Sequence, residues 1–558
     1  MKVSEILSAY PFEERIPVRL FQKLAKTDRD LIVDAKTGIR ITYAELAAKV
    51  DALSERLEGL GVKPGDRVAW SAPTGPDAII IWMAVAQLGG IDVGIGDVLK
   101  GPLLDHVLND SAPTALVIDP SMTAGLASLT AERRADFPGV IYTREPSNPI
   151  GETEMVLDLS SSVVSAAAGK VYDVPIDVRT PATIIYTSGT TGPSKGVLLC
   201  HHQQFFTGAT YTEYFRIDEG SVLYHYSPFN HVSGRQLVVA AMITGSLLVM
   251  QERFSISGFW KDINAHKVTH SITLGSAVPL LLSNRDPVAR NEGSLRYVWA
   301  SPALPQLYAE FAAKFDLKVI SPYGSTETGT VVQPGIIPDD PGPVGNSGRR
   351  PQYFELEVVD DNDHLCPPGV VGEIVIRPQL PWTTFVGYLG RDGATAQTIR
   401  NYWYHTGDLA RIDEDGWMFF VDRKQDFMRV RGENVSSIEL EQILLMHDAV
   451  TDCAIVPVQG ELADNEILAV VVASNGADAF ALIEFFEWCA SQVPHYMVPR
   501  YVRLLDDMPR GHSGKVEKHK LKTQGVTGET WDSSAAGLRA TRNGVQKKAP
   551  SHAALGLE

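Results

Sequence analysis

The chain has 558 residues, 44% of them hydrophobic and 21% charged, so it is long enough to bury a large core and to fold as more than one domain. Its 50 Lys and Arg residues stand against 67 Asp and Glu residues, and the net charge of −17 disfavours nucleic acid and anionic membranes as partners. The four cysteines lie far apart with no Cys-x-x-Cys pair, which argues against a disulfide framework and against a cysteine zinc site.

Neither the N-terminal segment nor the apolar stretches of the chain suggest export or membrane insertion. No apolar segment with a cleavage site follows Met1, and the most apolar stretches, Ala78–Leu88 and Leu237–Met250, are too short or too interrupted to cross a bilayer. We therefore expect a cytoplasmic protein with no integral membrane segment.

The first part of the chain alternates helix and strand patterns. Thr42–Glu45 forms a capping box, and apolar side chains then recur at helical spacing until Gly61 and Pro64. A second helix is predicted over Asp77–Leu88. Short apolar segments typical of buried strands are Asp66–Trp70, Ala115–Ile118, Ala182–Tyr186, Gly245–Met250, His270–Leu274, Tyr297–Ala300 and Val319–Ser321. This alternation predicts a large α/β region with helices on parallel sheet.

The character of the sequence changes after Tyr353. The strand-like segments Glu355–Val359, Glu373–Arg377 and Trp417–Val421 predict a β-rich subdomain. The charged segment 422–426 follows, and we place the domain boundary there because unpaired charges are not buried in a core. Beyond it, a helix capped at Ser436 and two further strands predict a small α+β domain. From Thr523 onward the composition predicts a disordered tail or a partner arm.

The segment Tyr186–Val197 carries the strongest chemical signal. It combines glycines, hydroxyl groups and Lys195 directly after a predicted strand, a composition suited to holding a polyphosphate. A Walker-type loop would end in Gly-Lys-Ser/Thr, whereas Gly196 follows Lys195 here. A plain flexible surface loop is the bland alternative.

Three further segments fit the same chemistry. Tyr323–Thr328 offers a ring for a purine, a hydroxyl for phosphate and, in Glu327, an oxygen ligand for Mg²⁺. Tyr404–Asp408 offers a carboxylate for ribose hydroxyls. Lys515 stands on a glycine-flanked loop from which it can reach a site and neutralise developing charge. Taken singly, each segment also fits a turn, an exposed acid or a solvated lysine.

In this order and at these separations, the four segments resemble the ANL superfamily of adenylate-forming enzymes, over residues 12–522. Segments 421–423, 431–436 and 438–441 are most similar to the acyl-CoA synthetase branch, in particular its crotonobetaine/carnitine-CoA ligase-like group. The resemblance implies a large N-terminal domain (1–422), a hinge (423–427) with Gln425 at its pivot, and a mobile α+β C-terminal domain (428–522), followed by the tail 523–558.

The resemblance also implies roles for individual residues. Thr187, Ser188, Gly189, Thr190, Thr191, Gly192 and Lys195 would form the phosphate loop. Tyr323 and Gly324 would lie at the adenine, with Ser301, Pro302 and Ala303 in the adjoining wall. Thr326 would contact the α-phosphate, Glu327 would hold Mg²⁺, and Asp408 and Arg423 would contact the ribose or phosphate. Lys515 would bridge carboxylate and α-phosphate, with Lys515, Thr326, Glu327 and Lys195 forming the catalytic set.

The acyl and thiol sides of the implied site rest on fewer residues. His231, Val232, Arg235 and Ala300 are expected at the acyl pocket, and Arg431, Gly432 and Glu433 on the coenzyme A side. Arg235 would meet a polar or anionic group of the substrate, with a structural ion pair as the alternative. Three positions depart from the family pattern: Gln425 at the hinge, Ala300–Leu304 in the adenine wall, and Pro193-Ser194 at the loop tip.

The implied reaction uses ATP, Mg²⁺ and coenzyme A. A carboxylic acid attacks the α-phosphate to give an acyl-adenylate and pyrophosphate, and a thiol then displaces AMP. Two other readings stay open: an adenylation enzyme that loads a carrier protein, and a non-catalytic nucleotide-binding protein. Which acid is activated and whether the chain forms a homodimer are not fixed by these residues.

Overall fold

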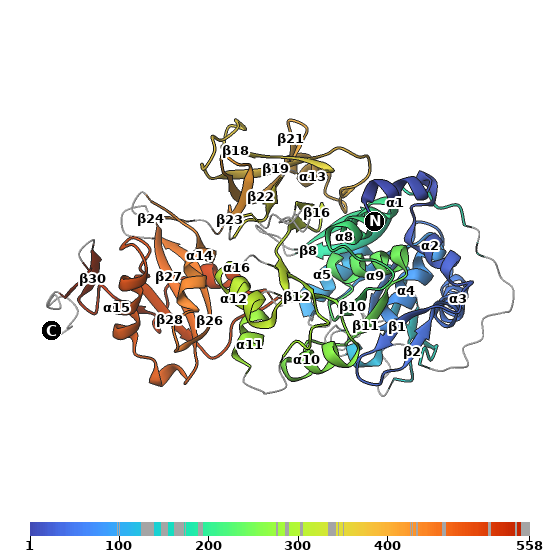
Figure 1. Cartoon of the computed structure of the whole chain (residues 1–558), viewed down its shortest axis with the longest axis horizontal. Helices are drawn as coiled ribbons and strands as arrows, with labels where there is room; N and C mark the ends of the chain where they lie inside the picture. The colour runs from blue at the N-terminus through green and yellow to red at the C-terminus, as the bar shows by residue number, and fades with distance from the viewer. Residues whose placement is uncertain are drawn as a thin grey trace. The chain divides into compact units, whose positions relative to one another are not determined.

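The computed structural model (Figure 1) describes the chain except residues 97–98, 100, 124–125, 127–138, 147–153, 161–171, 173, 188–193, 275–276, 285–289, 302–304, 333–341, 344, 350, 425, 427, 431–432, 460–464, 512–514, 542–543 and 548–558. The chain divides into two compact units. The first comprises residues 1–356, 376–404 and 415–419, and the second comprises residues 357–375, 405–414 and 420–558. The domain limits taken from the sequence remain predictions.

Two mostly parallel sheets form the framework of the first unit. One has eight strands in the order β20-β9-β8-β4-β3-β5-β6-β7, and the other has seven in the order β14-β13-β12-β10-β11-β1-β2. The strands of the first are β3 (Arg67–Ser71), β4 (Ile91–Gly94), β5 (Ala115–Ile118), β6 (Val140–Tyr142), β7 (Glu154–Val156), β8 (Pro181–Thr187), β9 (Lys195–Cys200) and β20 (Gly387–Tyr388). Those of the second are β1 (Asp30–Asp34), β2 (Arg40–Thr42), β10 (Val222–His225), β11 (Leu247–Met250), β12 (His270–Leu274), β13 (Tyr297–Ser301) and β14 (Lys318–Ile320).

All seven strand segments expected between Asp66 and Ser321 are present, within one or two residues of the predicted bounds. The pairs β3–β4, β3–β5, β10–β11 and β12–β13 are parallel, as the alternation predicts. The pair β8–β9 is antiparallel, so these two strands form a hairpin around the glycine-rich segment. The α/β fold class is thereby confirmed.

A layer of buried helices separates the two sheets. Helices α4 (Pro76–Gln87) and α8 (His201–Tyr214) contact the eight-stranded sheet, while α9 (Val232–Thr244) contacts β10 and β11 of the other sheet and packs on α8 (Figure 1). A helix that is apolar all round belongs in such a layer, and every residue of α4 from Ala78 to Gln87 is buried.

The remaining helices pack on this framework. They are α1 (Val3–Ala9), α2 (Pro17–Leu24), α3 (Tyr43–Gly59), α5 (Gly101–Ser111), α10 (Ile256–Ala265), α11 (Ala277–Ser283) and α12 (Pro305–Phe315). Helices α1, α2 and α3 contact the buried helices, whereas α5, α11 and α12 contact strands. The capping box of α3 is confirmed, because the Thr42 hydroxyl accepts from the Glu45 amide at 3.1 Å and the Glu45 carboxylate accepts from the Thr42 amide at 2.7 Å.

The β-rich region after Tyr353 is a sheet in the order β17-β23-β22-β19-β18. Its strands are β17 (Gly348–Arg349), β18 (Phe354–Val359), β19 (Gly372–Pro378), β22 (Trp403–Ile412) and β23 (Trp417–Arg423), with β21 (Ile399–Arg400) beside β22 and α13 (Asp392–Thr398) preceding it. A separate hairpin joins β15 (Tyr323–Ser325) to β16 (Gly329–Val332).

The C-terminal part is α+β, as expected. A four-stranded sheet has the order β26 (Val450–Gln459), β27 (Asn465–Ala473), β28 (Tyr501–Leu505), β29 (Trp531–Asp532), and it packs with α14 (Ser437–Leu444), α15 (Leu482–Gln492) and α16 (Lys518–Gln524). Two hairpins complete the region: β24 (Met428–Val430) with β25 (Glu433–Val435), and β30 (Leu538–Thr541) with β31 (Gly544–Lys547).

The expectation of a disordered tail from residue 523 is wrong for the described residues 523–541 and 544–547. Strand β29 pairs with β28, and Leu538 and Ala540 lie buried in the core of this region. The Arg500 guanidinium also pairs with Asp532 at 3.2 Å. The polar composition of the tail did not indicate these contacts. A few apolar residues are enough to order a segment when the edge of a sheet is available for strand pairing.

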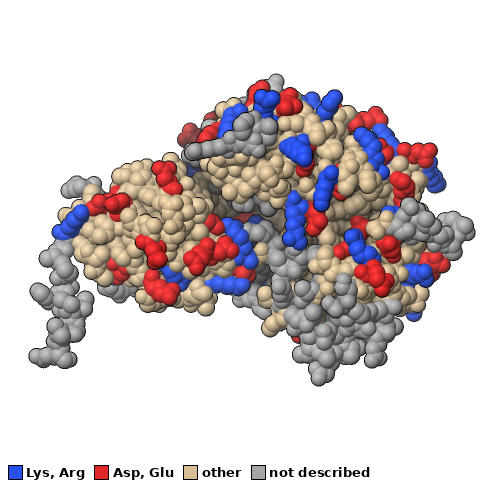
Figure 2. Space-filling model, turned by 90° about the horizontal axis from the view of Figure 1, so that it is seen from below, with Lys and Arg blue, Asp and Glu red and all other residues tan. Residues whose placement is uncertain are grey.

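On the face drawn in Figure 2, basic and acidic side chains are interspersed and, among the described residues of that face, no broad basic area is seen. Within the described part of the chain, no helix combines the length and the apolar character needed to span a bilayer.

Candidate active site

The base of the glycine-rich loop is fixed by pairing and by polar contacts. Thr187 of β8 lies opposite Lys195 of β9, which closes the hairpin. The Tyr186 hydroxyl donates to Asp110 at 2.8 Å, and the His106 ring lies 2.9 Å from the Ser194 carbonyl oxygen. The expected phosphate contacts from Ser188, Gly189, Thr190, Thr191 and Gly192 lie outside the described residues.

Gly196 shows why the hairpin needs a glycine just after Lys195. A Cβ atom there would lie 2.8 Å from the Ile184 side chain and 3.3 Å from the Tyr186 ring. The missing side chain therefore lets β9 pack closely on β8 at the point where the loop leaves the sheet.

A tyrosine that sequence reasoning missed connects two predicted site residues. The Tyr388 hydroxyl donates to Glu327 Oε1 at 2.9 Å, and the Lys195 amine lies over the Tyr388 ring, 5.3 Å from its centre. The Glu327 carbonyl also accepts from the Phe385 amide at 2.6 Å. The short strand β20 thus brings Lys195 and Glu327, 132 positions apart in the printed sequence, into one constellation.

Two buried tyrosines lie in the electric field of the Glu327 carboxylate. Burial, and then the neighbouring Glu327 charge, raise the pKa of the Tyr388 hydroxyl, and the same two causes raise the pKa of Tyr404. Both tyrosines therefore stay neutral, and Tyr388 serves Glu327 as a hydrogen-bond donor. Half-buried Glu327, turned toward Tyr388, is the kind of single carboxylate that Mg²⁺ uses together with substrate phosphates.

The hairpin that carries Tyr323, Gly324 and Thr326 depends on close backbone approach. A Cβ atom on Gly324 would lie 2.1 Å from the Gly329 carbonyl oxygen, so only glycine fits there. Tyr323 is buried, while Gly324 is exposed and Thr326 lies in the half-buried turn between β15 and β16. The residue beside the buried Tyr323 ring is therefore a glycine, and the next turn presents the half-buried Thr326.

Three further predicted residues come together in the second unit. Arg423 Nε lies 3.4 Å from Asp408 Oδ1. Lys515 as a residue is exposed, but protein atoms crowd its amine, and this loss of solvation lowers the pKa of Lys515. The nearby Arg423 charge lowers that pKa further, while the Asp408 carboxylate acts in the opposite direction. Lys515, Arg423 and Asp408 therefore share one electrostatic environment.

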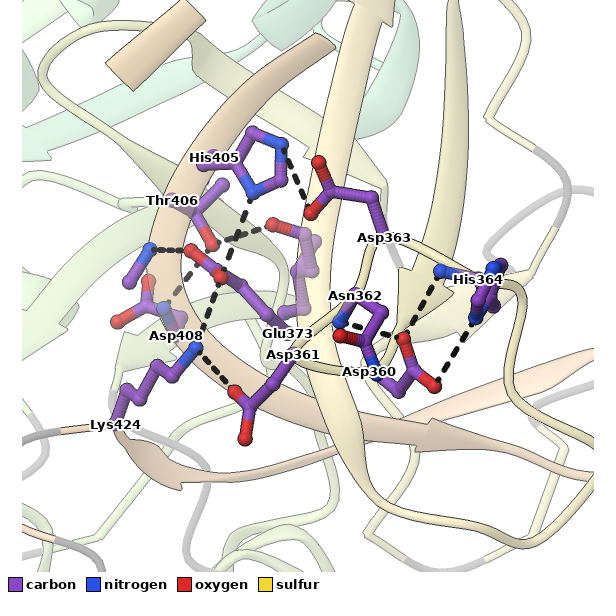
Figure 3. Close-up of polar contacts among 12 residues, drawn as sticks. Asp360, Asp361, Asn362, Asp363, His364, Glu373, His405, Thr406, Asp408 and Lys424 are labelled. Carbon is purple, nitrogen blue, oxygen red and sulfur yellow. Dashed lines mark hydrogen bonds and ion pairs between the residues drawn. The ribbon is translucent and has the colours of Figure 1, made fainter. Parts of the chain in front are cut away.

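The part of strand β22 that carries Asp408 is held by a network around Glu373, which sequence reasoning missed (Figure 3). Glu373 Oε1 accepts from the Gly407 amide at 3.1 Å, and Glu373 Oε2 lies 3.3 Å from the Lys424 amine and 3.4 Å from His405 Nδ1. The Lys424 amide in turn donates to the Gly407 carbonyl at 2.8 Å. A buried glutamate needs partners of this kind. The signal available in the sequence was a glutamate inside the apolar strand Gly372–Pro378.

Lys424, which lies in the predicted hinge segment 423–427, is tied to this network by a second carboxylate. Its amine also contacts Asp361 at 2.9 Å. Burial lowers the pKa of Lys424, but the Asp361 and Glu373 carboxylates outweigh it, so the pKa is raised. Lys424 therefore stays charged and holds the neighbouring Arg423 beside Asp408.

The predicted acyl-pocket residues divide into two groups. His231 and Val232 are half-buried at the N-terminal end of α9. Ala300, in contrast, is fully buried in the core cluster that contains Tyr308 and Phe311, so it lines no open pocket here. Ser301 ends β13, and Pro302 and Ala303 lie outside the described residues.

Arg235 corrects the sequence-based expectation. It is 3% exposed and pairs with Asp92, which is 1% exposed, so its charge is compensated inside the protein. A contact with an anionic group of a substrate is therefore wrong for Arg235, and the structural ion pair is the correct alternative. The partner lies 143 positions away, so no local pattern could reveal it.

Most of the residues expected at the coenzyme A side and at the hinge pivot lie outside the described part of the chain. Glu433 lies in β25, opposite Val430 of β24, whereas Arg431, Gly432 and Gln425 lie outside the described residues. Their roles stay predictions.

Two family models match the chain. The model of the AMP-binding enzyme family matches residues 21–389, and that of the AMP-binding enzyme C-terminal domain matches residues 439–515. A curated crotonobetaine/carnitine–CoA ligase of Salmonella enteritidis is 28% identical over 500 residues, covering 88% of this chain and 95% of the relative.

Two solved structures are also similar. ATP-bound MatB from Rhodopseudomonas palustris has a TM-score of 0.77 at 26% identity and covers 92% of this chain and 99% of its own. An anthranilate CoA ligase in complex with anthranoyl-AMP has a TM-score of 0.81 at 21% identity, covers 94% and 99% of the two chains, and shows a shared fold.

Proposed function

Because this chain belongs to the family of AMP-binding enzymes, we propose that it is an ATP-dependent acyl-CoA synthetase that forms an acyl-adenylate and then a thioester. The observation that carries the proposal is the shared environment of Lys515, Arg423 and Asp408, in which crowding and the Arg423 charge lower the pKa of the Lys515 amine while Asp408 acts in the opposite direction. Such a cation suits a reaction in which two anions, a carboxylate and a triphosphate, must approach each other.

In the first half-reaction, the carboxylate oxygen attacks the α-phosphorus and pyrophosphate leaves. Thr187 and Lys195, at the base of the glycine-rich loop, would hold the pyrophosphate side, and Thr326 the α-phosphate. Glu327 would hold Mg²⁺, which supplies charge neutralisation at the phosphates when bound. The carboxylate needs no general base, so catalysis is positioning and charge neutralisation, with Lys515 between the two reacting anions.

In the second half-reaction, the thiol of coenzyme A attacks the acyl carbonyl and AMP leaves. Arg431, Gly432 and Glu433 would face the coenzyme A side after rotation of domain 428–522 about Gln425. The curated relative's name supports coenzyme A as acceptor. The acid is a small-molecule carboxylate, and we propose that the enzyme works in the cytoplasm.

The test is a panel of carboxylic acids scored by AMP release, with and without coenzyme A. We expect one chemical group of acids to support pyrophosphate exchange in the absence of coenzyme A. The same acids should give rapid AMP release only when coenzyme A is present. AMP release that depends on a carrier protein would move the function to carrier loading. Tight ATP binding with no acid-dependent pyrophosphate exchange would overturn the enzymatic proposal.

A further inference from the structure

The guanidinium of Arg235 sits in the buried layer between the two sheets with all its polar contacts supplied by this chain. Nη1 donates to Asp92 Oδ1 at 2.9 Å and to the Thr183 hydroxyl at 2.7 Å, and Nη2 donates to Asp92 Oδ2. Its carbon centre lies 5.2 Å from the centre of the Trp82 ring and 6.0 Å from that of Trp70.

The partners of Arg235 are themselves satisfied. The Thr183 hydroxyl donates to Asp92 Oδ1 and accepts from the Gln204 amide at 3.0 Å, and Asp92 Oδ2 accepts from Trp70 Nε1 at 3.1 Å. A buried ion pair contributes little net stability relative to apolar side chains of similar size. Its geometry, rather than its energy, is therefore the informative feature.

One contact of Arg235 leaves this cluster and reaches the chain segment just before α9. Nε donates to the Phe229 carbonyl at 2.8 Å. Because Arg235 lies in the first turn of α9, this bond folds segment 229–235 back on itself. The segment carries His231 and Val232, the described residues proposed for the acyl pocket.

Two other buried contacts fix the same segment. The neutral His225 ring, whose pKa burial lowers to about 4, donates from Nε2 to the Gly234 carbonyl at 2.6 Å and stacks on the Phe229 ring. At Gly94 of β4, a Cβ atom would lie 3.0 Å from the Asn230 Cα, so the strand end touches the segment directly. A Cβ at Gly234 would lie 2.3 Å from the Pro228 carbonyl oxygen.

Exposure follows the same pattern. Phe229, Gly234 and Arg235 are buried, whereas the intervening residues 230–233 are half-buried. The segment is thus held rigidly at both ends and presents only its middle. A group placed by fixed ends keeps its position to a fraction of an ångström, which is what a binding wall requires.

We propose that Arg235, paired with Asp92, is a positioning residue that fixes the wall of the carboxylate pocket at His231 and Val232 and so sets affinity for the acid. The inference rests on the proposed function, in which this segment faces the acyl group. Arg235 acts through the Phe229 carbonyl and does not touch substrate. Loss of that bond loosens the pocket for the acid and leaves the ATP contacts unchanged.

The experiment uses the full chain with Asp92→Asn and Arg235→Met combined, so that no buried charge is left unpaired. The new Asn can accept from Trp70 and donate to Thr183, but the Phe229 carbonyl loses its donor. Tyr224→Phe is the matched control, because it removes a buried hydrogen bond, 2.8 Å to Asp262, that does not touch the segment. Arg235→Lys is the second variant, since it keeps the charge and loses the Nε donor.

Two readouts are compared: the KM values for acid and for ATP, and hydrogen exchange of amides 229–234. We expect the KM for the acid to rise about tenfold or more in both variants, with the ATP KM within about twofold and faster exchange in the segment. Tyr224→Phe should change none of these. If the double variant does not fold, Arg235→Lys decides the question on the same readouts.

Equal rises in both KM values, or unchanged KM and exchange, would overturn the inference. The hydrogen-exchange arm needs no turnover, so it remains informative if the wild type shows no acid-dependent pyrophosphate exchange, the result that would overturn the proposed function instead. Faster exchange in the segment without any acid KM effect would show a purely structural role and would also overturn the inference.

Discussion

Arg235 and Lys515 are two cations that the sequence analysis predicts beside the substrate, and they have opposite environments in the structure. Arg235 is buried, and Asp92, Thr183 and the Phe229 carbonyl accept four hydrogen bonds from its guanidinium. Lys515 is exposed, and the pKa of its amine is lowered by crowding and by Arg423. A cation that is hydrogen-bonded to buried protein groups can fix the position of a neighbouring segment. A cation whose charged form is destabilised by its surroundings gains the most stabilisation from a bound anion.

The comparison predicts opposite costs for removing each cation. Arg235→Met leaves the Asp92 carboxylate buried without its partner, which should lower the free energy of unfolding by about 3–5 kcal/mol. Lys515→Ala should change it by less than about 0.5 kcal/mol, because exposed side chains contribute little. Urea unfolding of both variants measures this. Equal stability of the two would remove the distinction between them.

The second largest effect concerns adenylation. Lys515→Ala should slow acid-dependent pyrophosphate exchange by about 10²–10³-fold, since it removes the cation between the reacting anions. Thioester formation from supplied acyl-AMP should change far less. Lys520→Ala serves as control, because Lys520 is exposed and pairs only with Glu517 among its described salt bridges. Equal loss in both half-reactions would contradict the assigned role.

A tenfold effect is expected at the Glu373 network. Glu373→Gln weakens the tie between the Gly407 amide and Lys424, and a hydrogen bond to a charged group contributes about 1.5–3 kcal/mol, part of which should reach Asp408. The ATP KM should rise about tenfold and the acid KM should not. Asp360→Asn is the control, since the exposed Asp360 carboxylate contacts the Asn362 and His364 amides and the His364 ring in Figure 3, and none of these contacts involves Glu373. A rise in the acid KM alone would argue against a nucleotide-side role.

The smallest effect is a pH shift. The pKa of Lys515 is lowered from its ordinary value of 10.5, so its amine loses charge at a lower pH than a solvated lysine does. Because kcat/KM reports the free enzyme, kcat/KM for adenylation should fall as pH rises through this pKa. Lys515→Arg, which stays charged, should move the fall to higher pH or abolish it. A pH profile that is identical in both enzymes would assign the fall to another group.

The sequence was most informative where information is local. The capping pattern at Thr42 predicted the start of a helix, and the apolar segments predicted strands to within one or two residues. Both signals are local, because a capping side chain and the periodicity of apolar residues involve neighbouring positions. The site motifs were identified by family resemblance. The described residues include Thr187, Lys195, Glu327, Asp408, Arg423 and Lys515, whose roles are proposals.

The failures share one cause: partners distant in sequence. Asp92 neutralises Arg235 across 143 positions, Tyr388 reaches Glu327 across 61, and Glu373 reaches Lys424 across 51. The tail was expected to be disordered because its composition is polar, yet Trp531 pairs with Val502 at a sheet edge. Tertiary pairing of this kind leaves no periodic trace.

The proposed chemistry is tested most directly by labelling the acid with ¹⁸O in both carboxylate oxygens. Attack of the carboxylate on the α-phosphorus transfers one labelled oxygen to AMP, and the other stays in the thioester. We predict one ¹⁸O atom in each AMP released with coenzyme A. Unlabelled AMP, or label in inorganic phosphate with ADP as product, would contradict the acyl-adenylate.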